Sequence, residues 1–169
     1  KFNIDLHKAK YFAGHSLGEY SAIACAGYLD FHDTIKILKV RGDAMQNAVP
    51  KGEGGMVAVL GTTVENIEKI LEKQKNNFLA EIANDNSDGQ IVLSGKTHDL
   101  EKLSSVLKEN KIKNIKLPVS APFHSSLMNN ATDIMQKELG KLKFKKGSNV
   151  LISNITADEI FNVDELKDL

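Results

Sequence analysis

The chain has little cysteine, proline or tryptophan: its 169 residues include one cysteine, three prolines and no tryptophan. A single cysteine, Cys25, excludes an internal disulfide and a cysteine-based metal cage. Because Cys25 lies within an apolar segment, we expect it to be a buried packing residue. No apolar run approaches the about 20 residues of a membrane-spanning helix, so no membrane partner is expected. These absences predict a cytoplasmic globular protein without a bound metal.

The chain also has no surplus of charge of either sign, since 22 Lys and Arg residues balance 22 Asp and Glu residues. Nucleic-acid binding needs a basic surplus or a basic stripe to neutralise phosphates. Lys143, Lys145 and Lys146 form only a small basic patch. We therefore expect no nucleic-acid partner.

Glycine, proline and turn-forming residues divide the chain into alternating strands and helices. In residues 1–50 this pattern predicts a strand at 11–13 and a helix at 17–26. It also predicts a second helix that begins after Asp30 and ends before Pro50. Residues 51–55 then form a flexible, glycine-rich joint.

The middle of the chain has a pattern of its own. Thr62 and Glu65 have the spacing of a capping box at a helix start, and the turn-rich run 84–89 separates two strands. The expected elements are strand 56–60, helix 62–75, strands 79–83 and 91–93, helix 97–110 and strand 112–119. This order predicts a ferredoxin-like βαββαβ unit.

The last part returns to the first pattern, with a helix at 127–142 and a buried strand at 150–153. We therefore predict an α/β protein whose parallel sheet is interrupted by the small unit. The predicted domains are a partial core formed by 1–55 and 120–169, and a ferredoxin-like subdomain formed by 56–119.

Gly14-His15-Ser16-Leu17-Gly18 is a G-x-S-x-G motif between a predicted strand and a predicted helix, which is the setting of a nucleophilic serine. The turn strains Ser16, and the two glycines remove side chains that would clash where strand and helix cross. Ser16 Oγ then projects at the helix N-terminus, where the Leu17 N–H and the helix dipole favour developing negative charge. The alternative is a plain turn in which Ser16 caps the helix.

A serine nucleophile needs a base, and His124 is the candidate. It follows Pro122 and Phe123 in a short segment between a predicted strand and helix, so its imidazole is presented from a stiff loop. Taken alone, however, His124 also fits a loop histidine without a role. The other histidines outside the motif have polar surroundings typical of the surface: His7, His32 and His98.

Arg41 is the third candidate, since an arginine near a catalytic serine can hold a substrate carboxylate through two parallel hydrogen bonds. It stands beside Gly42, which leaves space next to it. Composition alone favours the alternative of an exposed arginine paired with Asp43 or Glu53.

Together these segments resemble the malonyl-CoA:acyl carrier protein transacylase family. The resemblance is carried by GHSLGEY at 14–20, RGDAMQ at 41–46, NDNSDGQIVLSG at 84–95 and APFHS at 121–125. It implies an α/β-hydrolase-like parallel-sheet core with an inserted ferredoxin-like subdomain. It also implies malonyl transfer from malonyl-CoA to acyl carrier protein in cytoplasmic fatty acid biosynthesis, with the CoA thioester as substrate and no bound cofactor.

The resemblance assigns roles to individual residues. It makes Ser16 the nucleophile, His124 the base and Arg41 the clamp for the malonyl carboxylate. The Leu17 N–H would supply half of the oxyanion hole. Met45 and Phe123 would line the acyl pocket. Asn86 and Gln90 would lie beside the cleft.

The chain departs from the family pattern at both ends. The family opens with a Gly-Gln-Gly-Ser-Gln motif on its first strand, and continues past the position of Leu169 with an amide that orients the histidine. This chain begins at Lys1 instead of Met and ends in a helical segment. We therefore expect it to be a piece of a longer enzyme.

Two other functions remain open at this stage. A serine hydrolase, such as a thioesterase, shares the serine motif but needs an acidic residue between serine and histidine in chain order. Asp85 and Asp88 are available in that order, within the small unit. The second is a non-catalytic fragment that only docks a carrier protein.

Overall fold

The structure, a computed structural model, describes residues 5–160 and 162–168. Contacts divide the chain into two compact units. The terminal unit consists of Lys1–Gly42 and Ile134–Leu169, and the middle unit of Asp43–Asp133. The helices α2 (Phe31–Gln46) and α5 (Asn129–Leu139) contain residues of both units.

The terminal unit has a three-stranded sheet in the order β1-β6-β7. The strand β1 (Tyr11–Phe12) pairs in parallel with β6 (Val150–Ile152), which confirms that the strand expected at 150–153 returns to the first one. The next strand, β7 (Glu159–Ile160), pairs antiparallel with β6. The prediction of a parallel sheet was therefore wrong for β7, because a connection as short as 153–158 permits a hairpin but no crossover.

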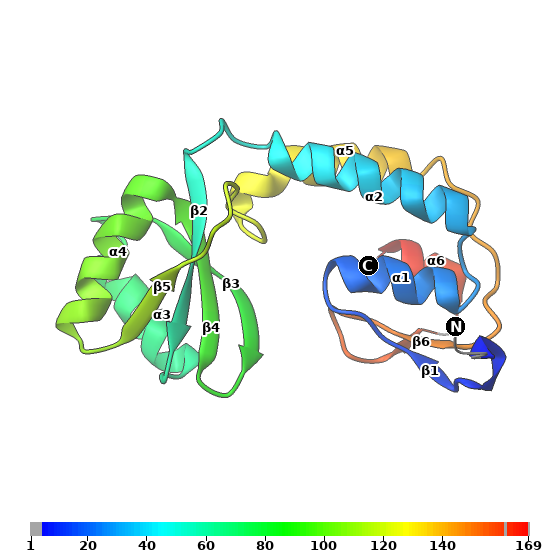
Figure 1. Ribbon diagram of the computed structural model, residues 1–169, viewed down its shortest axis with the longest axis horizontal. Coiled ribbons are helices and arrows are strands. Elements are labelled where there is room, and N and C mark those ends of the chain that lie inside the picture. Colours follow the sequence, from blue (N-terminus) through cyan, green and yellow to red (C-terminus); the bar gives the residue numbers. More distant parts are fainter. Residues whose placement is uncertain (1–4, 161, 169) are drawn as a thin grey trace. The chain divides into compact units, whose positions relative to one another are not determined.

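Helices cover this small sheet and complete its core. Figure 1 shows α1 (Leu17–Cys25) lying along β1 and β6. The short helices η1 (Leu6–Lys8) and α6 (Val163–Asp168) belong to the same unit. The apolar core contains residues from α1, α2, α5 and the sheet, such as Ile23, Ile37, Met135 and Leu151.

Cys25 is exposed, so the prediction that it is buried was wrong. The helix α1 buries Ala22 and Ile23 instead. Because the apolar residues of α1 do not form one clear stripe, its sequence did not indicate which side faces the core.

The middle unit is built on a four-stranded sheet in the order β3-β4-β2-β5. All neighbouring strands are antiparallel. The observed elements follow the predicted order of strand, helix, two strands, helix and strand: β2 (Gly54–Leu60), α3 (Val64–Gln74), β3 (Ala80–Ser87), β4 (Gln90–Lys96), α4 (Thr97–Glu109) and β5 (Lys113–Lys116).

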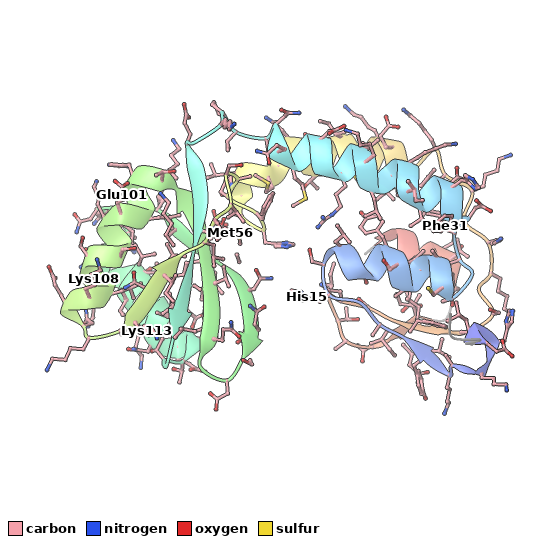
Figure 2. All side chains as sticks on the ribbon, viewed as in Figure 1. His15, Phe31, Met56, Glu101, Lys108 and Lys113 are labelled. Atoms are coloured by element: carbon pink, nitrogen blue, oxygen red, sulfur yellow. The ribbon has the colours of Figure 1, made fainter. Side chains whose placement is uncertain are left out.

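Both helices of this sheet lie on one of its faces (Figure 1). Their apolar stripes pack against alternate residues of the two central strands, and the core they form includes Val57, Ile67, Leu93, Leu103 and Leu107. The exposed residues Glu101 and Lys108 lie on the side of α4 that points away from the sheet (Figure 2).

Two boundaries in the middle unit differ from the prediction. The expected loop at 84–89 is mostly strand, because β3 continues to Ser87 and pairs with β4 through two register shifts. Asn and Asp suggest a turn, but such shifts accommodate them in a strand. Thr63 caps α3 by accepting a hydrogen bond from the Asn66 N–H at 3.3 Å, so the helix begins one residue later than the box at Thr62 predicted.

The helix expected at 127–142 is divided into a 3₁₀ turn, η2 (Ser126–Met128), and α5. The limits of the compact units also differ from the predicted domain limits, since 43–55 and 120–133 are grouped with the βαββαβ elements. Grouping residues by their contacts does not test where one domain is inserted into the other along the chain. The domain limits 1–55, 56–119 and 120–169 therefore stay a prediction. Among the described helices, none has the length and apolar character that crossing a membrane requires.

Replacing Leu103 by alanine should destabilise the middle unit. The side chain is fully buried between α4 and the sheet, and losing a buried leucine side chain costs about 2–5 kcal/mol. Urea unfolding measures the change in the free energy of unfolding. Glu101→Ala, on the exposed side of the same helix, should change it by less than about 0.5 kcal/mol; equal effects of both variants would contradict the packing described here.

Candidate active site

Ser16 stands at the turn between β1 and α1 in a backbone conformation that L-residues rarely adopt, with φ 51° and ψ −110°. Hydrogen bonds close the turn, since the Gly18 N–H donates to the His15 carbonyl at 2.9 Å and the Glu19 N–H to the Ser16 carbonyl at 3.1 Å. Figure 2 shows His15 at the same end of α1. Such a conformation costs about 1–3 kcal/mol and persists only when neighbouring contacts enforce it.

Gly14 allows strand and helix to approach closely at this turn. A Cβ atom at Gly14 would lie 2.0 Å from both the carbonyl carbon and the carbonyl oxygen of Gly18. A Cβ atom at Gly18 would meet no heavy atom of the described residues within 4 Å. The predicted need for glycine is therefore confirmed at position 14, whereas at position 18 it was wrong: the backbone of Gly18 is the obstacle, not its missing side chain.

The Ser16 hydroxyl contacts Arg41. The Nη2 atom of Arg41, on α2, donates a hydrogen bond to Ser16 Oγ at 3.0 Å. Ser16 occupies the capping position of α1, yet its side chain makes no capping hydrogen bond. The Ser16 hydroxyl therefore does not act as the side-chain cap of α1, which was the alternative to a nucleophile.

Arg41 is half-buried and lies over an aromatic ring, with its Cζ atom 5.8 Å from the centre of Tyr20. Burial raises the pKa of the Tyr20 hydroxyl, and the nearby guanidinium opposes that rise. Arg41 is therefore not the exposed arginine of the alternative interpretation, because its side chain is half-buried and donates to Ser16 Oγ. The positively charged guanidinium of Arg41 thus lies next to the Ser16 hydroxyl.

Leu17 begins α1 and its side chain is exposed. The first N–H groups of an α-helix have no partner inside the helix, and the positive end of the helix dipole lies there. The position is thus suited to stabilise negative charge next to Ser16.

Two residues at this turn were missed by the sequence analysis. The side-chain oxygen of Asn154 accepts a hydrogen bond from the Ser16 N–H at 3.0 Å. The Asn154 N–H in turn donates to Glu19 Oε1 at 2.8 Å. Ser16 and Asn154 are 138 residues apart in sequence, and no local pattern connects them.

His124 belongs to the middle unit, where it lies on the loop between β5 and η2, is exposed and has a positive φ of 55°. Pro122 is fully buried, and a Cβ atom at Gly54 would lie 2.3 Å from its ring. The Ser125 hydroxyl donates to the Pro122 carbonyl at 2.7 Å. The loop is thus restrained on the side where the sequence predicted a stiff approach to His124.

Glu81, on β3, holds the other side of this loop and was also missed. Its carboxylate accepts hydrogen bonds from the Ser126 N–H, at 3.0 Å, and from the Ser126 hydroxyl. An exposed glutamate in a strand gives no signal of such a role in sequence. The loop that carries His124 is therefore fixed two residues after the imidazole.

The other predicted site residues also lie in the middle unit. Met45, near the end of α2, and Phe123 are half-buried. Asn86 and Gln90 are exposed, one on β3 and one at the first position of β4. The structure thus brings Ser16, Leu17 and Arg41 together in the terminal unit, and it places the remaining predicted residues on the middle unit.

The acidic residues that a hydrolase would need are on the β3–β4 hairpin, where Asp85 and Asp88 are both exposed. The histidines assigned to the surface are exposed as predicted, His32 beside Asp30 and His98 beside Asp99. Within residues 5–160 and 162–168, no cluster of three or more His, Cys, Asp or Glu side chains is arranged to hold a metal ion.

The fold is α/β and is shared with solved bacterial acyl-group transferases. The acyl-carrier-protein-S-malonyltransferase from Bartonella henselae superimposes with a TM-score of 0.91 and 38% identity, over 98% of this chain and 54% of that one. A malonyl-transacylase solved in complex with a type II polyketide acyl-carrier protein gives a TM-score of 0.89 and 32% identity, over 95% and 53% of the two chains.

Residues 7–165 match the acyl transferase domain, and the chain belongs to this family. The malonyl CoA-acyl carrier protein transacylase of Bacillus subtilis is 41% identical over 158 residues, which are 92% of this chain and 50% of that protein. The chain spans about half the length of the curated relatives it matches.

Gly14→Ala should destabilise the terminal unit, because the added Cβ atom would lie 2.0 Å from the Gly18 backbone and the turn would have to open. Overpacking of this kind costs about 1–3 kcal/mol or more. Gly18→Ala is the matched control, since its Cβ atom meets open space and alanine favours the helix. Thermal unfolding should show a lower midpoint for Gly14→Ala alone. A loss of equal size in both variants would refute the close approach.

Proposed function

We propose that the chain contributes to an acyltransferase that moves a malonyl group from malonyl-CoA to the phosphopantetheine thiol of acyl carrier protein, in cytoplasmic fatty acid biosynthesis. The observation that carries the proposal is the contact between Ser16 Oγ and Arg41 Nη2, at 3.0 Å, on a strained strand–helix turn. An acyltransferase for a dicarboxylic acyl group needs both a nucleophile and a fixed cation beside it. Relatives that carry the transacylase name support the same substrates.

The reaction proceeds in two halves. Ser16 Oγ attacks the thioester carbon of malonyl-CoA while His124 takes its proton, and the bond from carbon to sulfur breaks. The protonated His124 returns the proton to the leaving CoA sulfur, which gives malonyl-serine and free CoA. The thiol of acyl carrier protein then attacks the ester, and Ser16 regains its proton as the bond to Oγ breaks.

Each charged intermediate needs stabilisation. The Leu17 N–H, at the positive end of α1, provides half of the oxyanion hole. The role of His124 rests on the family resemblance, and the restrained loop that carries it agrees with the task of a base. No resident cofactor or metal enters either half, since the CoA thioester is itself the substrate.

Arg41 selects the acyl group. A guanidinium binds a carboxylate through two parallel hydrogen bonds, and its location at Ser16 puts that clamp next to the ester being formed. Met45 and Phe123 are proposed to line the acyl pocket, and Asn86 and Gln90 to lie beside the cleft.

The architecture we propose is an α/β-hydrolase-like core, formed by 1–55 and 120–169, with a ferredoxin-like subdomain at 56–119. The strand order β3-β4-β2-β5, with all neighbours antiparallel, supports the ferredoxin-like assignment. A thioesterase fits less well, because it has no use for Arg41 and its acid would have to come from the exposed β3–β4 hairpin. The cation at the nucleophile likewise argues against a module that only docks a carrier protein.

Ser16→Ala should abolish covalent labelling by radiolabelled malonyl-CoA, measured as acid-stable radioactivity on the protein, because no other group supplies the attacking oxygen.

His124→Ala should slow acylation by several orders of magnitude, roughly the loss seen on removing a triad member. The controls are Ser21→Ala, at an exposed position of the same helix, and His98→Ala, both with wild-type labelling. Persistent labelling of Ser16→Ala would end the assignment, and normal kinetics of His124→Ala would place the base elsewhere.

Arg41→Ala should lower malonyl transfer by about 10- to 100-fold relative to acetyl transfer, the effect of losing a charged hydrogen bond of about 1.5–3 kcal/mol. Arg41→Lys should recover only part, since lysine lacks the planar fork. A competition between malonyl-CoA and acetyl-CoA measures the ratio, which cancels any general effect of losing the contact with Ser16. Equal use of acetyl-CoA by the wild type, or an unchanged ratio in Arg41→Ala, would show that Arg41 is not the clamp.

A further inference from the structure

The strained turn at Ser16 needs contacts from outside its own segment. Its local hydrogen bonds, from Gly18 to His15 and from Glu19 to Ser16, also occur in ordinary helix starts and do not select a positive φ. Residues in such conformations are stable only where the surroundings over-determine them. A contact from another segment to the Ser16 N–H would provide this support.

Asn154 supplies it from the loop between β6 and β7. Its side-chain oxygen accepts from the Ser16 N–H at 3.0 Å, and its own N–H donates to the Glu19 carboxylate at 2.8 Å. One residue therefore binds both ends of the first turn of α1, the backbone at position 16 and the side chain at position 19. Two contacts in opposite directions resist both sliding and rotation of that turn.

The loop that carries Asn154 is closed by its own hydrogen bonds. Ser153 is 2% exposed, and its hydroxyl accepts hydrogen bonds from the Ile155 and Thr156 N–H groups, each at 3.1 Å. The Ser153 N–H donates to the Asp158 carbonyl at 2.9 Å, which closes the loop. Asn154 thus lies on a hydrogen-bonded loop, whereas its own side chain is exposed and fills no core space.

We propose that Asn154, held by Glu19, is a positioning residue for the nucleophile: its hydrogen bond to the Ser16 N–H maintains the turn from which Ser16 Oγ and the Leu17 N–H act. This inference rests on the proposed function only for the identity of the substrate. Asn154 touches no reacting atom, so its removal affects the alignment of the serine and leaves the acyl pocket intact.

The test compares variants of the protein at its natural length. Asn154→Ala should lower kcat for malonyl transfer by about 10- to 100-fold, the scale of a misplacement of about 1 Å, with KM changed less than twofold. Ile155→Ala removes a neighbouring side chain, 66% exposed in the same loop, and should match the wild type. Hydrogen exchange followed by NMR should show faster exchange of the Ser16 amide in Asn154→Ala alone.

Glu19 provides a second, independent set of variants. Glu19→Gln keeps an oxygen that accepts from the Asn154 N–H and should retain most of the activity, whereas Glu19→Ala should resemble Asn154→Ala. Because the two residues act on the same turn, the double alanine variant should lose little more than Asn154→Ala does. Should Asn154→Ala lower the unfolding midpoint strongly, the comparison of Glu19→Ala with Glu19→Gln decides.

A serine-directed fluorophosphonate separates this inference from the proposed function, since the probe needs a reactive serine and no malonyl group. Slower reaction of Asn154→Ala with the probe supports the positioning role. If the wild type reacts with the probe but not with malonyl-CoA, the proposed function is wrong, and the probe rates still decide the role of Asn154. Equal rates of wild type and Asn154→Ala with the probe, or a loss confined to KM, would overturn it.

Discussion

The site depends on one close approach, in which Gly14 lies against the backbone of Gly18. This packing lets the chain reverse within a few residues, and Ser16 in the reversal has a positive φ. In the turn that this approach allows, the Ser16 hydroxyl contacts Arg41, and Leu17 stands at the start of α1. A larger residue at position 14 would relax the turn and separate these groups.

The elements that local patterns determine were predictable. The serine turn, the stripe of α4 and the βαββαβ order all follow from spacing over a few residues, and the structure contains them. Local patterns were insufficient where the pairing of strands determines the structure. The run 84–87 is composed of turn-forming residues but becomes strand because β4 offers a partner. The exposed side of α1 was undecided because its apolar residues do not form one clear stripe.

The contacts that support the site were beyond sequence reasoning for the same reason. Arg41 was best interpreted from composition as a surface ion pair, yet it contacts Ser16, 25 residues earlier. Asn154 accepts a hydrogen bond from the backbone N–H of Ser16, and Glu81 accepts one from a backbone N–H in the loop that carries His124. In both cases the partner is distant in sequence. Any polar side chain can form such a hydrogen bond, so the residue type alone does not reveal the contact. Only the fold determines which polar side chain reaches the backbone N–H.

The pairing of Tyr11 with Val150 has a consequence for the order of folding. The middle unit makes its sheet from strands that follow one another closely, whereas the sheet of the terminal unit joins the two ends of the chain. Contacts between distant segments form late, because closing the long loop costs entropy before any pairing repays it. During synthesis the serine turn therefore lacks its contact with Asn154 until the segment after β6 has left the ribosome, so this contact forms only after the middle unit has had time to fold.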